Sequence, residues 1–313
     1  MGEAVGTGPR AGALHEVVDG VYAWVQPDGT WWVNNAGAVA GDDGVLVVDT
    51  CATATRTRRF LDALTAVTGG APVRWALNTH QHGDHTYGNS LLPASTALIG
   101  QTTMRQALKT DPLFENVPPA WTPTPNWGAV TRRLPSITMD RELTLHLGGR
   151  RVDLRHPGYT AHTPGDVVAW LPEERVLFTG DLLFHGLTPL VFMGSVPGAL
   201  RSLEWMRAFS PEHVVPGHGP VLGSTDLDSV LAAHERYYRF VLATAEESVR
   251  ADRTPLETAK ALDLGEFAAW ADSERIVMNL HRAQADLVGE PMDLLGALGD
   301  AVAWNGGPMA TGV

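Results

Sequence analysis

The stretch Asn78-Thr79-His80-Gln81-His82-Gly83-Asp84-His85 decides how this sequence is interpreted. Four side chains that can bind a divalent metal lie within six residues, directly after an apolar run that predicts a strand. In an extended loop, residues i and i+2 point to the same side, so His80 and His82 can converge on one metal ion. Asp84 and His85 lie beyond the bend at Gly83 and are placed for a neighbouring ion. Imidazole and carboxylate ligands suit zinc, with iron or manganese as alternatives.

Six residues rarely complete a site for two metals, so further ligands are expected from other loops. His162, Asp181 and His218 each lie near the end of a predicted strand, beside glycines that permit a tight loop. The single cysteine, Cys51, lies elsewhere in the chain, which excludes a sulfur-rich zinc site and an internal disulfide. One cysteine also favours a reducing compartment, and we expect a cytoplasmic protein.

Composition limits the classes of protein that remain. The chain has 313 residues, 44% hydrophobic and 19% charged, which is typical of a globular protein. Its net charge of −12 argues against a nucleic-acid partner, because such partners are bound by clustered Lys and Arg. The apolar runs are far shorter than the roughly 18 residues of a membrane helix, so we expect no membrane segment. We expect a flexible tail over residues 1–12, a catalytic core over 13–225, and a C-terminal helical extension over 226–313 packed on the same domain.

Residue patterns predict alternating strands and helices, followed by helices alone. Residues 112–135 contain six prolines and no helical period, and predict a long ordered loop of the kind that forms lids. The expected strands are 17–25, 31–40, 45–48, 73–79, 143–147, 151–154, 167–171, 176–178 and 214–215. The first expected helix begins at Asp49 and ends near Val67. Two more span 197–209 and 226–251, and two shorter helices follow before Gly306.

The complete set of candidate ligands resembles the metallo-β-lactamase superfamily pattern: H-x-H-x-D-H, a downstream His, a bridging Asp and a final His. The resemblance covers roughly residues 15–223. It implies an α/β fold, the αββα four-layer sandwich, with the metals at one edge of two sheets. Asp49 matches the aspartate that supports the ligands in this family. By the same resemblance a first zinc ion is bound by His80, His82 and His162, a second by Asp84, His85 and His218, and Asp181 bridges both.

Asp181 distinguishes between branches of the superfamily. The commonest true zinc β-lactamases have Cys at this position, whereas a bridging Asp is similar to glyoxalase II-type thioesterases, lactonases and phosphodiesterases. Two adjacent cations can acidify a shared water and polarise a carbonyl, and can also stabilise an enolate. We therefore consider Asp84 and Asp181 the candidate catalytic residues, with either Asp181 or the metal-bound hydroxide itself as the base.

Three further segments, residues 187–196, 263–287 and 303–307, are similar to the second-ring cyclases of aromatic type II polyketide biosynthesis, actinorhodin type. This resemblance implies intramolecular aldol cyclisation and dehydration of a poly-β-ketone intermediate, with thioester hydrolysis that releases it from acyl carrier protein. The alternative is a general metallo-hydrolase, either a glyoxalase II-like thioesterase or a lactonase. The ring pattern of the substrate, the native metal and the oligomeric state are left open.

A flat, apolar substrate would need an aromatic pocket, and an acidic carrier protein would need a basic surface. Arg56, Arg58 and Arg59 form one candidate docking cluster, and residues 132–133 and 150–151 form two others. The candidate pocket residues are Trp31, Trp32, Trp127, His185 and Phe192.

Overall fold

The computed structural model describes residues 12–26 and 29–313. All but the last residue of the expected tail, 1–12, therefore lies outside the described residues. None of the described helices is both long enough and apolar enough to cross a membrane.

One sheet of the described chain has seven strands, in the order β1-β2-β3-β4-β5-β6-β8. Its central strand β4 is buried along its whole length, because its side chains alternate between two cores. Val45 and Val47 pack on one face, whereas Leu46 and Val48 face the other sheet. The strands are β1 (Ala13–Val18), β2 (Val21–Val25), β3 (Ala36–Gly41), β4 (Gly44–Val48), β5 (Val73–Leu77), β6 (Ala97–Gln101) and β8 (Ile137–Met139).

The second sheet has six strands among the described residues, in the order β14-β13-β12-β11-β10-β9. Strand β12 is buried throughout; Phe178 faces the first sheet and Leu177 faces the opposite side. The strands are β9 (Glu142–Leu147), β10 (Arg150–Arg155), β11 (Val168–Leu171), β12 (Val176–Phe184), β13 (His213–His218) and β14 (Leu222–Gly223).

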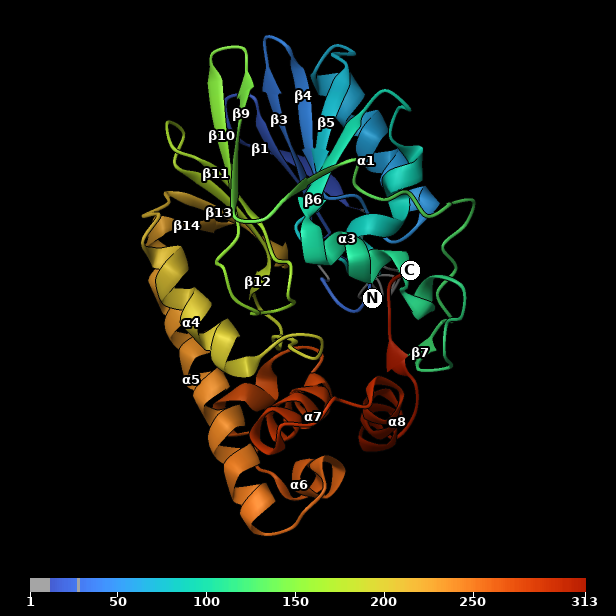
Figure 1. Ribbon diagram of the computed structural model, residues 1–313, viewed down its shortest axis with the longest axis vertical. Helices are drawn as coiled ribbons and strands as arrows, with labels where there is room; N and C mark the ends of the chain where they lie inside the picture. The colour runs from blue at the N-terminus through green and yellow to red at the C-terminus, as the bar shows by residue number, and fades with distance from the viewer. Residues whose placement is uncertain (1–11, 27–28) are drawn as a thin grey trace, which may run out of the picture.

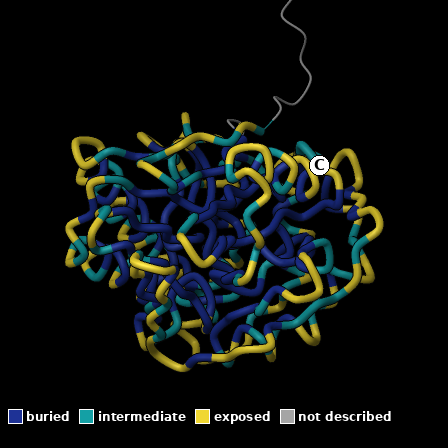
Figure 2. The backbone as a smooth tube through the Cα atoms, turned by 90° about the horizontal axis from the view of Figure 1, so that it is seen from above, coloured by how far each residue is buried: buried dark blue, intermediate teal, exposed yellow. Residues whose placement is uncertain are grey.

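Helices cover the outer faces of both sheets. Helix α1 (Ala54–Val67) places Phe60 and Leu64 in the core on the first sheet, while α4 (Val196–Arg207) and α5 (Ser224–Arg250) pack on the second. Figure 1 shows the sheets face to face between these helices, and Figure 2 shows the buried backbone concentrated inside. The expected αββα four-layer sandwich is thus confirmed.

The C-terminal region adds helices below the sandwich (Figure 1). They are α6 (Pro255–Ala261), the 3-10 helix η3 (Gly265–Ala269), α7 (Arg275–Val288) and α8 (Leu294–Asn305). Their buried side chains belong to the same apolar cluster as those of α4 and α5. Strand β15 (Met309–Ala310) then pairs in parallel with β7 (Trp121–Thr122), so the chain end contacts the proline-rich segment.

Several expected boundaries were wrong for local reasons. The stretch 17–25 is a hairpin, because Gly20 turns the chain with φ 69°. The strand expected at 31–40 begins only at Ala36, since Trp32 has φ 67°. Helix α1 begins at Ala54 rather than Asp49, because Thr53 caps it by accepting a hydrogen bond from the Arg56 amide. Three α-helices, not two, follow α5 in the described chain.

Elements that the patterns did not predict surround the metal-binding stretch. Two short helices, α2 (Gly83–Thr86) and the 3-10 helix η1 (Tyr87–Leu91), follow His82 directly, and α3 (Thr102–Lys109) follows β6. The segment expected as a loop contains the 3-10 helix η2 (Pro112–Phe114) and strand β7.

Candidate metal centre and pocket

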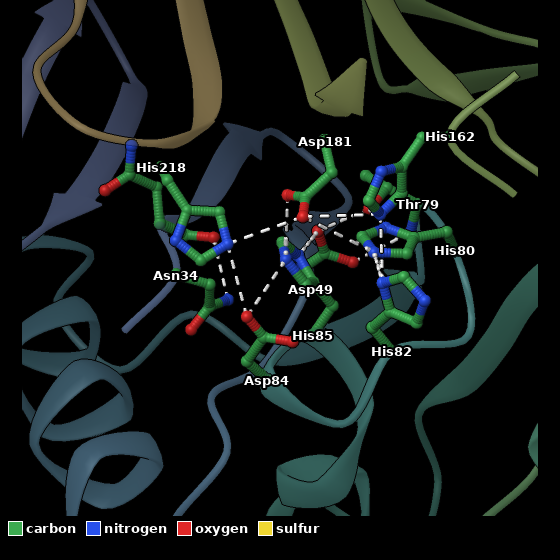
Figure 3. A network of polar contacts seen from close by, with 12 residues as sticks. Asn34, Asp49, Thr79, His80, His82, Asp84, His85, His162, Asp181 and His218 are labelled. Atoms are coloured by element: carbon green, nitrogen blue, oxygen red, sulfur yellow. Dashed lines mark hydrogen bonds and ion pairs between the residues drawn. The ribbon is translucent and has the colours of Figure 1, made fainter. Parts of the chain in front are cut away.

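Three imidazoles meet at one point near the edge of the two sheets (Figure 3). His82 Nδ1 lies 3.0 Å from His80 Nε2 and 2.9 Å from His162 Nε2. Burial lowers the pKa of all three rings, of His82 to about 3 and of His162 to about 4. The rings are therefore neutral at pH 7, and three nitrogen lone pairs can bind one cation, as a zinc site requires.

Asp84, His85 and His218 form a second group beside the first. Asp84 Oδ2 lies 3.2 Å from His218 Nε2 and 3.7 Å from His85 Nε2. Burial would lower the pKa of both histidines, but the adjacent carboxylates, led by Asp181, outweigh it and raise the pKa of His218 to about 9. These carboxylates thus favour a positive charge beside His85 and His218.

Asp181 lies between the two groups, where a bridging ligand would stand. Its Oδ1 is 3.1 Å from His85 Nε2, and its Oδ2 is 3.4 Å from both His162 Nε2 and His218 Nε2. Residue 217 must be glycine for this arrangement, because a Cβ there would overlap the Asp181 carboxylate. The ligand atoms of each group lie within 4.8 Å of one another when Asp181 is counted with the first.

The donor set fits two metal ions. His85 Nε2 and Asp181 Oδ1 are both buried without a hydrogen-bond partner among the described residues, and a cation between them would satisfy both. Four ligand histidines use Nδ1 in a hydrogen bond, which leaves Nε2 directed at the centre. The acceptors are Thr79 Oγ1 for His80, Asp49 Oδ2 for His85, Leu190 O for His162 and Gly29 O for His218.

Asp49 lies behind the centre and contacts the residues that support it. Its carboxylate accepts hydrogen bonds from the amide and hydroxyl of Thr79, each at 2.7 Å. The same hydroxyl accepts from His80, so Asp49 positions His80 and His85 together. Asp49 has φ 60°, an uncommon backbone conformation that turns it out of strand β4 and toward the ligands.

A pocket opens onto the metal centre, and its floor includes His82, Asp84, Asp181 and His218. Of the expected pocket residues, Trp31, Trp32 and Phe192 line it. Trp127 does not line it but packs behind Trp32, with ring centroids 4.7 Å apart. His185 does not line it either; its Nδ1 hydrogen-bonds the Pro220 carbonyl.

Other lining residues were not expected to form the pocket. Arg275 and Met278 lie in the segment 263–287. The resemblance of that segment to the cyclases is the sequence feature that could have indicated these two residues. Tyr87, Asp111 and Leu298 carry no sequence signal, because only packing brings them to the pocket. Asp111 accepts a hydrogen bond of 2.6 Å from the Tyr87 hydroxyl.

The arginine clusters proposed for docking are largely engaged within the protein. Arg56 is buried, and its guanidinium donates to the carbonyls of Trp32 and Asn34, so it cannot belong to a docking surface. Arg133 likewise donates to backbone carbonyls, and Arg150 pairs with Glu174. Arg58 and Arg59 remain exposed on α1.

With this geometry in place, comparison with known proteins identifies the class. The metallo-beta-lactamase superfamily model matches residues 29–218, more than half of the chain, and the chain belongs to that superfamily. This is a superfamily of metallo-hydrolases that typically bind zinc. Every residue of both metal-binding groups described above lies within the matched region.

Two curated relatives illustrate the range of activities nearby. The chain is 24% identical over 220 residues to the 2,4-dinitroanisole O-demethylase subunit alpha of Nocardioides sp., covering 68% of this chain and 57% of the relative. It is 33% identical over 142 residues to the hydroxyacylglutathione hydrolase of Methylococcus capsulatus, covering 44% of each. The chain thus spans about half the length of these relatives.

Solved structures share the fold. A stereoselective inverting sec-alkylsulfatase from Pseudomonas sp. has a TM-score of 0.69 at 16% identity, covering 91% of this chain and 51% of the sulfatase. A metallo-beta-lactamase from Pontibacter korlensis has a TM-score of 0.58 at 17% identity, covering 72% of this chain and 99% of its own. Because the match to the sulfatase covers 91% of this chain, it extends beyond residue 218, where the match to the superfamily model ends. Part of the C-terminal helical region is therefore shared with the sulfatase as well.

Proposed function

We propose that the protein is a zinc enzyme that closes the second ring of an aromatic poly-β-ketone by aldol cyclisation and dehydration, and hydrolyses the thioester that links it to acyl carrier protein. One observation carries this proposal. Five residues that line the pocket, Leu190, Phe192, Met193, Arg275 and Met278, come from residues 187–196 and 263–287, the segments that resemble the polyketide cyclases, and the pocket opens directly onto the metal centre.

The pocket suits a flat ring system. Phe192 stacks on His82 with ring centroids 5.0 Å apart and an interplanar angle of 18°, which places aromatic surface beside a metal ligand. Trp31 and Trp32 also line the pocket. Each aromatic contact with a substrate ring would contribute about 0.5–1.5 kcal/mol beyond simple burial.

Two bound zinc ions would polarise a substrate carbonyl and acidify a shared water. The protein contributes the remaining features. Although burial alone would raise the pKa of Asp84, the neighbouring histidines hold it at about 2, and they also keep the pKa of Asp181 well below its usual value. Both carboxylates are therefore ionised at neutral pH, as ligation requires, and Asp84 also borders the pocket, within reach of a bound substrate. The largely apolar walls would shield a bound aldol from bulk water, which favours its dehydration.

The test uses a short aromatic acyl thioester mimic of the poly-β-ketone, with products followed by mass spectrometry. We expect both the free acid and the dehydrated bicyclic product, and loss of both in His82→Ala. Free acid without bicycle would reject the cyclase assignment. A His82→Ala enzyme that binds both metals and cyclises at the full rate would reject the role of this centre.

The second candidate is a general thioesterase, supported by the likeness to hydroxyacylglutathione hydrolases. Arg275 is the one cationic side chain, histidines apart, among the described pocket residues, and it is already paired with Asp272 at 2.8 Å. Glutathione carries two carboxylates, so this pocket offers it little free positive charge. Comparing the rates on a hydroxyacylglutathione and on the aromatic thioester separates the two candidates.

A further inference from the structure

The segment of residues 187–193, which we call the strap, joins the end of β12 to the loop before α4. It has no regular secondary structure apart from one bridge to Ala271, although most of its side chains are buried. Its backbone polar groups therefore need partners outside the segment, because an unpaired buried group is costly. The partners of Thr188, Pro189 and Val191 come from the C-terminal region, which lies below the sandwich in Figure 1.

Helix α7 holds the strap with two side chains one turn apart on the same helix face. Arg275 Nη1 donates to the Thr188 carbonyl at 3.0 Å. Asn279 is 1% exposed; its Oδ1 accepts from the Val191 amide at 2.6 Å and its Nδ2 donates to the Pro189 carbonyl at 2.8 Å. Asn279 thus binds the backbone on both sides of Leu190.

Leu190 connects this clamp to the first metal-binding group. Its carbonyl oxygen accepts the hydrogen bond from His162 Nδ1 at 2.7 Å, which fixes the ring orientation and the tautomer that leaves Nε2 free. Two residues further along the strap, Phe192 stacks on His82. Two of the three imidazoles of that group therefore rest on the strap, whereas the contacts of Asp84, His85 and His218 involve other segments.

We propose that Asn279 is a positioning residue for the metal site formed by His80, His82 and His162. It acts through the strap, by holding the Leu190 carbonyl where His162 can donate to it. The C-terminal helical region is then a working part of the metal centre as well as a wall of the pocket. This inference does not depend on the substrate proposed above.

The test measures metal affinity in the full-length protein. Metal-free Asn279→Ala and wild type are titrated with Zn²⁺ in competition with a chromophoric chelator. We expect one of the two zinc ions to bind about 10- to 100-fold more weakly in the variant, the usual effect of removing the support of a ligand histidine, with the other ion unchanged. Cobalt substitution should show an altered electronic spectrum for one ion only.

Two further variants complete the experiment. Gln284→Ala lies on the same helix and removes a hydrogen bond to Ser248 Oγ, away from the strap; it should leave both affinities at the wild-type value. Asn279→Asp keeps the shape and the acceptor for Val191 but loses the donors to the Pro189 carbonyl and the Tyr237 hydroxyl, so it should show an equally selective loss and serves if the alanine variant does not fold. Equal weakening of both ions, or two unchanged affinities with only a lower Tm, would overturn the proposal.

Discussion

His85 Nδ1 lies 2.8 Å from Asp49 Oδ2; both side chains are buried, with His85 in the metal centre and Asp49 directly behind it. Through Thr79, the same carboxylate also supports His80, which belongs to the other group of ligands. Asp49 is therefore the point at which the two metal-binding groups share one support. Asn279, in contrast, supports only the first group.

Asp49→Asn should weaken the binding of both zinc ions, by about 10- to 100-fold each. The asparagine amide would present hydrogens to the Thr79 amide, the Thr79 hydroxyl or His85, all of which donate to Asp49 in the wild type. Chelator competition on the purified variant measures the effect. The control is Asp62→Asn, at an exposed position on α1. Wild-type affinity for either ion in Asp49→Asn would contradict a shared support.

Arg56→Met should lower the free energy of unfolding by at least about 3 kcal/mol. The substitution removes the donors for the carbonyls of Trp32 and Asn34 and for two side-chain oxygens, and each buried acceptor left unpaired costs about 1–3 kcal/mol. Denaturant unfolding of the zinc-loaded protein checks this. Arg59→Met, one helical turn away and exposed, should change stability by no more than about 0.5 kcal/mol. Equal effects of the two substitutions would show that Arg56 is not structural.

Local spacing accounts for what could be predicted of the metal centre. The four ligands in residues 80–85 follow one strand, and their chemistry is apparent without any tertiary information. His162, Asp181 and His218 could be found because each was expected near a strand end beside a glycine. His218 does end β13, whereas Asp181 lies within β12, which is longer than the expected strand, and His162 lies in the loop between β10 and β11. The αββα fold followed from the family pattern of these ligands.

The walls of the pocket could not be predicted in the same way. Met278 and Leu298 reach it only because α7 packs against the strap, about a hundred residues away along the chain, and α8 packs on α7. Neither helix carries a pattern that marks the pocket side. Trp127 shows the converse, since its aromatic side chain and its place in the proline-rich segment suggested the pocket, yet it packs behind Trp32.

Phe192→Leu should raise the KM for an aromatic thioester by about 2- to 10-fold, which corresponds to the loss of one aromatic contact of about 0.5–1.5 kcal/mol. Leucine keeps the wall apolar, so the change isolates the ring. Steady-state kinetics measure it, with zinc content determined in parallel because Phe192 also stacks on His82. Phe209→Leu, where the ring packs on Trp205 outside the pocket, is the matched control. An unchanged KM in fully loaded Phe192→Leu would remove this residue from substrate binding.

His234 should make the protein less stable in mild acid. It is buried on α5, its Nε2 accepts a hydrogen bond from the Phe184 amide, and burial lowers its pKa to about 4. Between pH 4 and the ordinary histidine pKa of about 6.5, the unfolded chain binds a proton at this residue that the folded protein does not. The free energy of unfolding therefore falls as the pH is lowered through this range, by up to about 1.4 kcal/mol per pH unit.

The measurement compares zinc-loaded wild type with His234→Gln by denaturant unfolding at pH 7, 6 and 5. Glutamine can accept the same hydrogen bond but does not titrate in this range. The stability of the variant should fall less steeply between pH 7 and pH 5, so the difference between the two proteins should shrink as the solution becomes more acidic. Loss of zinc in acid affects both proteins and cancels in this difference. His15→Gln, at an exposed position on β1, should keep the wild-type slope. Parallel pH profiles for wild type and His234→Gln would mean that His234 titrates normally in the folded protein.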